Sequence, residues 1–144
     1  MEYLSTLDDK GRISLPARIR NGLKANSLIL TKGNENSVWL FTPQEWEVFS
    51  EKLMAAPSLT MKESIIIQHR FIVPMVEMEI DKAGRIAIPQ SLRDFAGLSR
   101  DCKILEARKH LELWDSGRYD AFLKANDEEL QKVLEKMGPV ALFT

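Results

Sequence analysis

The sequence predicts an α+β fold in which two tandem units share one small barrel-like sheet, with helices on the outside. The segment DDKGRISLPARIR at 8–20 is repeated as DKAGRIAIPQSLR at 81–93. Each copy is followed by runs of β-forming residues that are too short to bury a face alone. The chain has 144 residues, which is enough for one hydrophobic core but short for two independent cores.

The repeat has an offset of 73 residues and extends beyond the motif. The matched pairs within the motif are Asp8 and Asp81, Gly11 and Gly84, Arg12 and Arg85, Ile13 and Ile86, Pro16 and Pro89, and Arg20 and Arg93. The apolar residues Val38, Leu40, Phe41, Trp46 and Phe49 fall on Leu111, Leu113, Trp114, Tyr119 and Phe122. Recurrence over this length indicates a tandem structural unit.

The first part of each unit is expected to form a hairpin of two short strands, followed by a short helix. Apolar residues alternate around each turn, and Gly11 and Gly84 can supply the positive φ that other residues resist. Asp8 and Asp81 enter these turns, where an aspartate accepts hydrogen bonds from the backbone two residues on. A proline then marks the start of each helix, expected at ARIRNGL and QSLRDFAGL.

The second part of each unit is expected to be another hairpin, closed by a helix. The strand pairs are SLILTK with SVWLF, and DCKILEA with HLELW. Helix N-cap patterns are Thr42 with Glu45, Thr60 with Glu63, and Asn126 with Glu129. We predict a first repeat at 1–54, a connecting helix at 55–73, a second repeat at 74–125, and a C-terminal helix and tail at 126–144. The apolar tail VALFT either packs on the core or docks on another subunit.

The composition is that of a soluble globular protein, with 44% hydrophobic and 28% charged residues. No apolar run approaches the roughly 20 residues of a membrane span, and MEYLSTLDD lacks the features of a signal peptide. We therefore expect a cytoplasmic protein with no membrane partner. Cys102 is the only cysteine, which excludes an intramolecular disulfide and a cysteine-based zinc site. A lone thiol in a strand is usually a small buried hydrophobe.

The sequence contains no pattern typical of an enzyme. His69 and His110 lie in unrelated segments without a histidine or cysteine at ligand spacing, and GxSxG, HExxH and P-loop motifs are absent. We predict no catalytic residue, no metal ligand and no cofactor. Asp8 and Asp81 could meet as a carboxylate pair, but their position favours a role in the turns.

Charge is distributed unevenly, although the formal net charge is −1. From 8 to 32, six cations face two anions, a local balance of +4. From 112 to 136, seven anions face four cations, a local balance of −3. This polarity suits a protein that presents one face to a polyanion.

Arg12 and Arg85 allow two compatible interpretations. In one, each arginine pairs with the aspartate four residues earlier and stiffens the turn, contributing about 0.2 to 1 kcal/mol if exposed. In the other, a guanidinium raised on a rigid turn binds guanine bidentately or a phosphate. The aromatic Trp39, Trp46 and Trp114 lie among leucines and valines, which favours core packing over stacking on bases.

The doubled D-x-x-x-R signature, the run GRIAIPQSLRDFAGL and the later ELWD at 112–115 resemble the MraZ family of bacterial transcriptional regulators. This family is related to the AbrB-like swapped-hairpin DNA-binding proteins, and the resemblance extends from residue 7 to about 125. It implies tandem SpoVT-AbrB βαββ units in one double-psi or swapped-hairpin β-barrel. It also implies a cytoplasmic, nucleoid-associated repressor of the division and cell wall gene cluster, including its own promoter. Such a repressor binds short direct repeats in double-stranded DNA as a ring-shaped homo-oligomer.

Within the motif, the resemblance assigns DNA contact to Arg12, with Lys10 beside it, and makes Arg85 the equivalent in the second copy. We include Arg18 and Arg20 from the basic segment among the predicted DNA contacts. An alternative is an antitoxin-like module of the same hairpin class, whose acidic helices at 116–137 would bind a toxin. A third interpretation is a structural oligomer with no DNA partner.

Overall fold

The computed structural model describes residues 1–138, so the expected tail VALFT lies outside the described residues. The strands are β1 (Glu2–Thr6), β2 (Arg12–Ser14), β3 (Ser27–Lys32), β4 (Val38–Phe41), β5 (Val76–Glu79), β6 (Arg85–Ala87), β7 (Asp101–Glu106) and β8 (Leu111–Asp115). The helices are α1 (Ala17–Gly22), α2 (Pro43–Met54), α3 (Met61–Ile67), the π-helix η1 (Gln68–Ile72), α4 (Gln90–Ala96), α5 (Ser116–Ala125) and α6 (Asp127–Met137). Mixed strands and helices agree with the predicted α+β class.

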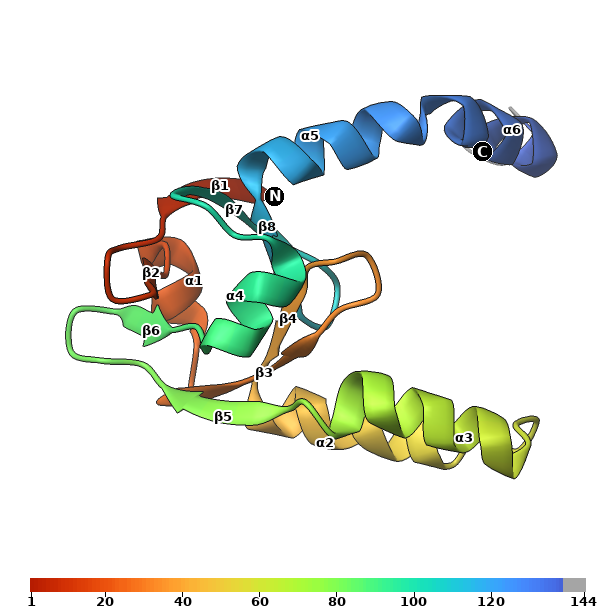
Figure 1. Cartoon of the computed structure of the whole chain (residues 1–144), viewed down its shortest axis with the longest axis horizontal. Coiled ribbons are helices and arrows are strands. Elements are labelled where there is room, and N and C mark those ends of the chain that lie inside the picture. Colours follow the sequence, from red (N-terminus) through yellow and green to blue (C-terminus); the bar gives the residue numbers. More distant parts are fainter. Residues whose placement is uncertain (139–144) are drawn as a thin grey trace.

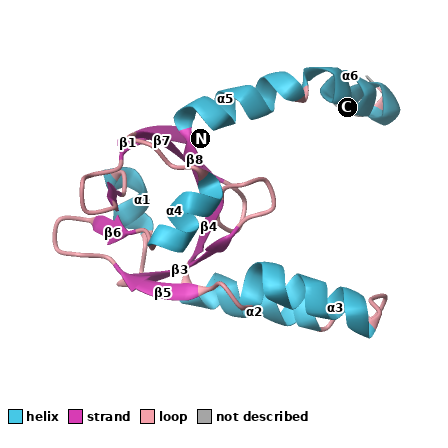
Figure 2. Cartoon of the chain, viewed as in Figure 1, coloured by secondary structure: helices cyan, strands magenta, loops and turns pink. Residues whose placement is uncertain are grey.

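The strands form one six-stranded antiparallel sheet and one two-stranded ribbon (Figure 2). The order in the large sheet is β1-β7-β8-β4-β3-β5, and the ribbon pairs β2 with β6. The hairpins β3–β4 and β7–β8 were predicted correctly. β1 lies against β7 of the second unit, and β5 lies against β3 of the first unit. The two units therefore exchange strands within one sheet.

Each Gly-Arg turn joins two short antiparallel segments, as predicted, but their pairing with each other is confined to the residues next to the turn. Leu7 bridges Ile13 and Ile80 bridges Ile86, and the N–H groups of Asp8 and Asp81 donate to the carbonyls of Arg12 and Arg85, both at 2.9 Å. Beyond these bridges, β2 and β6 pair with each other, and β1 and β5 pair with strands of the opposite unit. β2 and β6 have three residues each, which is too short for a stable hairpin. Exchange supplies every short strand with a partner.

An approximate twofold axis relates the two units, and the strand register reveals it. Ile13 pairs with Ile86, its own counterpart at the offset of 73, in the centre of the ribbon. Trp39 pairs with its counterpart Glu112 between β4 and β8. Such self-pairing occurs where an antiparallel pair straddles a twofold axis.

The correspondence shifts by one residue in β3 and β7. Leu30 lies opposite Val76, and the equivalent pair in the other half is Ile104 opposite Tyr3. The offset here is therefore 74, because α4 has seven residues and α1 has six. The offset is 73 in the turns and in α1 and α4, and it returns to 73 from β4 and β8 onward.

The core lies between the ribbon, the large sheet and the helices α1 and α4. Ile13 and Ile86 in the ribbon are fully buried, and Ile19 and Leu92 bring the two helices onto them. The other buried members of this core are Leu15, Leu28, Leu30, Val38, Leu40, Ile88, Ala96, Cys102, Ile104 and Leu113. As predicted, Cys102 is a buried hydrophobe, and burial raises the pKa of its thiol to about 11.

Two helical arms leave the sheet on the same side of the molecule (Figure 1). The first arm contains α2, α3 and η1, and the second contains α5 and α6. Thr42 Oγ1 accepts a hydrogen bond from Glu45 N, and Thr60 forms a capping box with Glu63, both as predicted. The connecting helix begins at Met61, directly after its predicted cap Thr60, and it continues as η1.

The predicted side-chain cap at Asn126 was wrong. Asn126 Nδ2 donates to the carbonyl of Phe122 at 2.7 Å, so the side chain closes the end of α5 instead of starting α6. Aromatic side chains pack where the arms meet the sheet. Trp39 stacks on Phe71 with ring centroids 5.6 Å apart, and the largely buried Trp114 lies 5.0 Å from Phe122.

Candidate nucleic-acid interface

One carboxylate organises the first turn, residues 8–12. Asp8 Oδ1 accepts hydrogen bonds from the backbone N–H groups of Lys10 and Arg12, both at 2.9 Å. Asp8 Oδ2 accepts from Arg12 Nε at 2.8 Å. The backbone N–H of Gly11 donates to the Asp8 carbonyl at 3.0 Å and closes the turn. Donation by the Arg12 backbone N–H is the main cause that lowers the pKa of Asp8.

The second turn, residues 81–85, has the same internal geometry. Asp81 Oδ1 accepts from the backbone N–H groups of Ala83 and Arg85, both at 2.9 Å. Asp81 Oδ2 accepts from Arg85 Nε at 3.0 Å. In both turns the aspartate accepts a hydrogen bond from Nε of the arginine. Within residues 1–138, the terminal nitrogens Nη1 and Nη2 of Arg12 and Arg85 donate no hydrogen bond. Both aspartates thus serve their own turns and do not form a carboxylate pair.

Glycine is required in both turns, as predicted. Gly11 has φ of 74° and Gly84 has φ of 77°, in the left-handed region that side chains resist. An arginine from the opposite unit covers each glycine. A Cβ on Gly11 would lie 2.8 Å from Arg93 Cζ, and a Cβ on Gly84 would collide with the Arg20 side chain. Arg20 Nη1 also donates to the carbonyl of Ala83 at 3.2 Å.

Cross-unit backbone bonds join the two turns. The N–H of Leu15 donates to the carbonyl of Gly84 at 2.9 Å, and the N–H of Ile88 donates to that of Gly11 at 2.8 Å. Together with the β2–β6 ribbon, these bonds fix the turns relative to each other. Both turns project from the side of the molecule opposite the helical arms (Figure 1).

Four of the five predicted DNA contacts gather at these turns. Lys10 and Arg12 belong to the first turn, and Arg85 belongs to the second turn, where Arg20 joins it. Arg18 lies elsewhere: its Nη1 is 3.3 Å from Met1 Sδ, at the end of β1 remote from the first turn.

Sequence reasoning missed Arg93, which covers the first turn. Its Nη2 donates to Gln90 Oε1 at 3.0 Å, while its buried Nε has no hydrogen-bond partner in the described chain. The signal was available, because Arg93 is the counterpart of Arg20 at the repeat offset. Considering the turns one at a time hid a residue that acts across the two units.

No group of three or more His, Cys, Asp or Glu side chains is placed to hold a metal ion within residues 1–138. His110 Nε2 lies 3.0 Å from Glu112 Oε2, within the aromatic cluster around Trp39. None of the described helices has the length and apolar character needed to cross a membrane.

Comparison with known proteins gives a consistent family signal. The family model described as "MraZ protein, putative antitoxin-like" matches the chain twice, over residues 2–68 and 71–138. The "Transcriptional regulator MraZ" of Treponema denticola is 44% identical over 139 residues, covering 96% of each chain. The protein of the same name from Treponema pallidum is 39% identical, covering 97% of this chain and 94% of its own. That of Acetivibrio thermocellus is 33% identical, covering 98% and 97%.

Proposed function

The chain belongs to the MraZ family, and from this premise we propose that it is a sequence-specific DNA-binding transcriptional regulator without enzymatic activity. The two turns are its DNA-contacting surface. Arg12 and Arg85 bind base edges or phosphates, and Lys10 and Arg20 add phosphate contacts. The observation that carries the proposal is the aspartate clamp on Nε, which fixes each guanidinium and leaves its terminal nitrogens available for bidentate bonds.

We further propose a repressor of the division and cell wall gene cluster, including its own promoter, that works in the cytoplasm on the nucleoid. In this proposal, a homo-oligomeric ring binds short direct repeats in double-stranded DNA. The helical arms support self-association, because they expose many apolar side chains that isolated subunits would leave in water. These are Val48, Met54, Met61, Ile65 and Ile66 on the first arm, and Leu123, Leu130, Val133 and Met137 on the second.

Multivalency explains how a nearly neutral subunit binds specifically. One subunit offers few phosphate and base contacts, which give modest affinity. Several subunits held together convert later contacts into intramolecular ones and raise the overall affinity by about 10²- to 10⁴-fold. The repeats would then lie near one helical turn apart, so that successive subunits meet the same face of the duplex.

The finer fold assignment is part of the same proposal. The exchange of β1 and β5 between units supports an AbrB-like swapped-hairpin barrel of the double-psi kind. We propose repeat boundaries at 1–54 and 74–125, joined by 55–73 and followed by 126–144. Arg18 stays a predicted DNA contact in its own right, separate from the two turns.

Binding to the DNA upstream of the protein's own gene tests the function. The repeat is the short DNA sequence that the protein protects in this upstream region. Fluorescence anisotropy with one, two and three copies of this repeat should show an affinity that rises with the number of copies. Affinity should also fall steeply with salt, because several phosphates are neutralised. An affinity that does not change with the number of repeats would contradict the multivalent mechanism. Absence of binding at low salt would contradict the DNA-binding proposal itself.

A second candidate function is an antitoxin-like DNA binder with a toxin partner. The description of the matching family model contains the words "antitoxin-like". The exposed start of α6 carries Asp127, Glu128 and Glu129, which could face a basic partner. The two candidates separate by purification from the native host: a stoichiometric complex with a small basic protein favours the antitoxin, and a homo-oligomer alone favours the regulator.

A further inference from the structure

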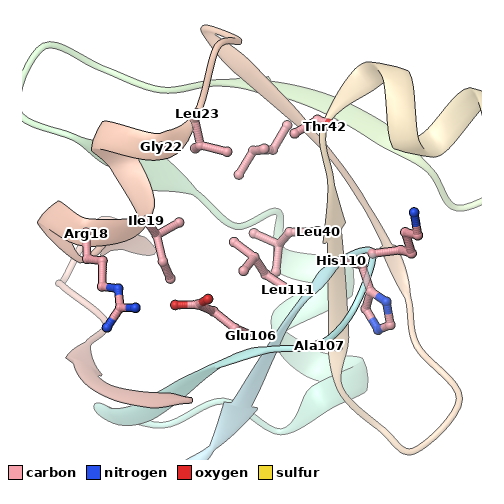
Figure 3. A pocket seen from close by; sticks show the side chains of 12 residues that line it. Arg18, Ile19, Gly22, Leu23, Leu40, Thr42, Glu106, Ala107, His110 and Leu111 are labelled. Atoms are coloured by element: carbon pink, nitrogen blue, oxygen red, sulfur yellow. The ribbon is translucent and has the colours of Figure 1, made fainter.

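A cavity of about 280 Å³ opens beside α1, away from the two turns (Figure 3). Its lining comes from α1, β3, β4 and the connection between β7 and β8. The interior is apolar, with Ile19, Leu23, Leu28, Leu40 and Leu111. Arg18, Glu106 and Lys109 add charged side chains to the lining. An apolar interior with a few polar groups is the usual character of a small-molecule site.

The twofold repeat shows which residue stands at the equivalent position in the second half. Gly22 ends α1, and its counterpart at the offset of 73 is Phe95 in α4. The Phe95 ring is half-buried, with Lys32 Nζ 5.2 Å and Arg70 Cζ 4.7 Å from its centroid. Lys32 in β3 is the counterpart of Glu106 in β7, at the offset of 74 that relates these strands. The second half therefore carries an aromatic ring at the position where the first half has glycine beside the cavity.

The backbone does not require glycine at position 22. Gly22 is outside the positive-φ region, and a Cβ built on it would meet no atom within 4 Å. Glycine within a helix costs roughly 0.5 to 1 kcal/mol relative to alanine. Its presence here leaves the space beside α1 open, whereas the other half of the molecule carries a phenylalanine at this position.

The charged part of the lining favours a negatively charged head group. The Arg18 guanidinium lies 3.3 Å from Met1 Sδ and close to the Tyr3 hydroxyl, and within residues 1–138 it forms no ion pair. Lys109 forms no ion pair within residues 1–138. The carboxylate of Glu106 is already engaged, because its Oε1 accepts a hydrogen bond from the Tyr3 hydroxyl at 2.6 Å. Arg18, on the same side of the cavity as Glu106 (Figure 3), is therefore the cation that a ligand's carboxylate can meet.

We propose that this cavity binds a small effector with a single aromatic ring and a carboxylate, the ring taking the place that the side chain of a Phe95 counterpart would occupy and the carboxylate meeting Arg18. The cavity touches Ile19 and Gly22 of α1, the helix whose Arg20 supports the second turn. A ligand here stabilises α1 and thereby the turn. This regulatory part rests on the proposed DNA-binding function, while the binding part does not.

Ligand binding is tested first without DNA. Phenylacetate is titrated into the full-length ¹⁵N-labelled protein, with benzyl alcohol and benzylamine as neutral and cationic analogues. Phenylacetate should bind with a Kd of about 0.1 to 10 mM, as expected for a ligand of this size, and should shift the amides of α1 and the β7–β8 connection. The affinity should decrease from phenylacetate to benzyl alcohol to benzylamine. No shift with any of the three, or tightest binding of benzylamine, overturns the proposal.

Gly22→Phe and Gly22→Ala form a matched pair. Both remove the glycine, but only the phenylalanine fills the cavity, so Gly22→Phe should lose phenylacetate binding at least tenfold and Gly22→Ala should keep it. Arg18→Gln should weaken phenylacetate about fivefold and leave benzyl alcohol unchanged, because it removes a charge and no apolar surface. Equal binding to wild type and to a folded Gly22→Phe variant, checked by its amide spectrum, places the ligand elsewhere and overturns the assignment.

The regulatory part is read from DNA affinity at saturating phenylacetate. With phenylacetate present, the affinity of the wild-type protein for its promoter DNA should rise by at least about fivefold, which is within the usual range of allosteric coupling. Gly22→Phe should not respond. An unchanged affinity in wild type rejects the coupling and leaves the ligand site standing. Absence of DNA binding under every condition contradicts the proposed function, and is distinguished from failure of the ligand site by the titration without DNA.

Discussion

The first and second turns share one hydrogen-bonded skeleton but differ in charge. The first contains Asp8, Asp9, Lys10 and Arg12, and with Arg93 above it the cluster has a formal charge of +1. The second contains Asp81, Lys82 and Arg85, and with Arg20 it reaches +2. The side chain of Arg85 is 36% exposed and that of Arg12 is 28% exposed. The skeleton is constrained by the turn, whereas the charges around it have diverged.

This difference makes the second turn at least as well suited to a polyanion as the first. Resemblance to the family emphasises Arg12, but the geometry gives no reason to rank Arg85 below it. A useful set of experiments therefore changes equivalent positions in the two turns and compares the results.

Arg12→Ala and Arg85→Ala should give the largest effect. Loss of one base-reading arginine costs about 1 to 3 kcal/mol per site, and an oligomer repeats that loss in every subunit. We expect Arg12→Ala and Arg85→Ala each to weaken operator binding at least tenfold, measured by anisotropy at one fixed salt concentration. Arg108→Ala, an exposed arginine outside the turns, is the matched control and should bind normally.

Both arginine variants should keep their near-ultraviolet circular dichroism, because neither side chain belongs to the core. A variant that unfolds would assign the arginine to the structure of the turn. A folded Arg12→Ala protein that binds DNA normally would show that the first turn is not the reader, and the comparison with Arg85→Ala would then decide whether the second turn is.

Gly11→Ala and Gly84→Ala should have the next largest effect. A side chain at positive φ costs about 1 to 2 kcal/mol, and the new Cβ must also displace the arginine from the opposite unit. We expect the larger loss of unfolding free energy at Gly84, where the clash with Arg20 is closer. Denaturant unfolding measures it. Gly117→Ala is the control, since the nearest atom to its Cβ is Asp115 Oδ2 at 3.6 Å.

Local features of both turns were predictable, because their causes lie within five residues. Gly11 and Asp8 define a turn by backbone conformation and hydrogen bonding alone. The same is true of the caps at Thr42 and Thr60, whose partners lie three residues away. Asn126 shows the limit of such patterns. Its side chain can bond either to a carbonyl of the preceding helix or to an N–H of the following helix, and the pattern N-x-x-E does not determine which bond forms.

Long-range features were less predictable for a different reason. Alternation in β1 and β5 indicates strands but does not identify their partners, and in a repeat each strand has two equivalent partners to choose from. The choice of the opposite unit depends on burying Ile13 against Ile86. Arg93 and the cavity at Gly22 were missed because both depend on how one unit is placed against the other.

Acid should affect the two turns alike, and less than the glycine substitutions. Hydrogen bonds from the backbone N–H groups of Arg12 and Arg85 are the main cause that lowers the pKa of Asp8 and of Asp81. A lowered folded pKa favours the ionised carboxylate, so the stabilisation is present above pH about 4, the ordinary aspartate value, and is lost as pH falls further.

Comparison of Asp8→Asn and Asp81→Asn with wild type, by thermal melting between pH 3 and 7, checks this sign. Each variant should melt below wild type at pH 7, and the gap should narrow at pH 3. A gap that widens on acidification would mean that the carboxylates are not held in their charged form. A gap for only one variant would show that the turns differ in stability as well as in charge.

Pro16→Ala and Pro89→Ala should have the smallest effect. Each proline directly precedes a helix and forms no side-chain cap. Its own φ is near −55°, a conformation that alanine adopts without strain. The loss therefore comes from greater freedom of the unfolded chain, about 0.4 to 1 kcal/mol. Pro16→Ser should recover most of it, because serine at this position can accept a hydrogen bond from the first turn of α1. A loss above about 2 kcal/mol for either alanine variant would exceed this entropic term and would mean that the proline ring itself packs between the two units.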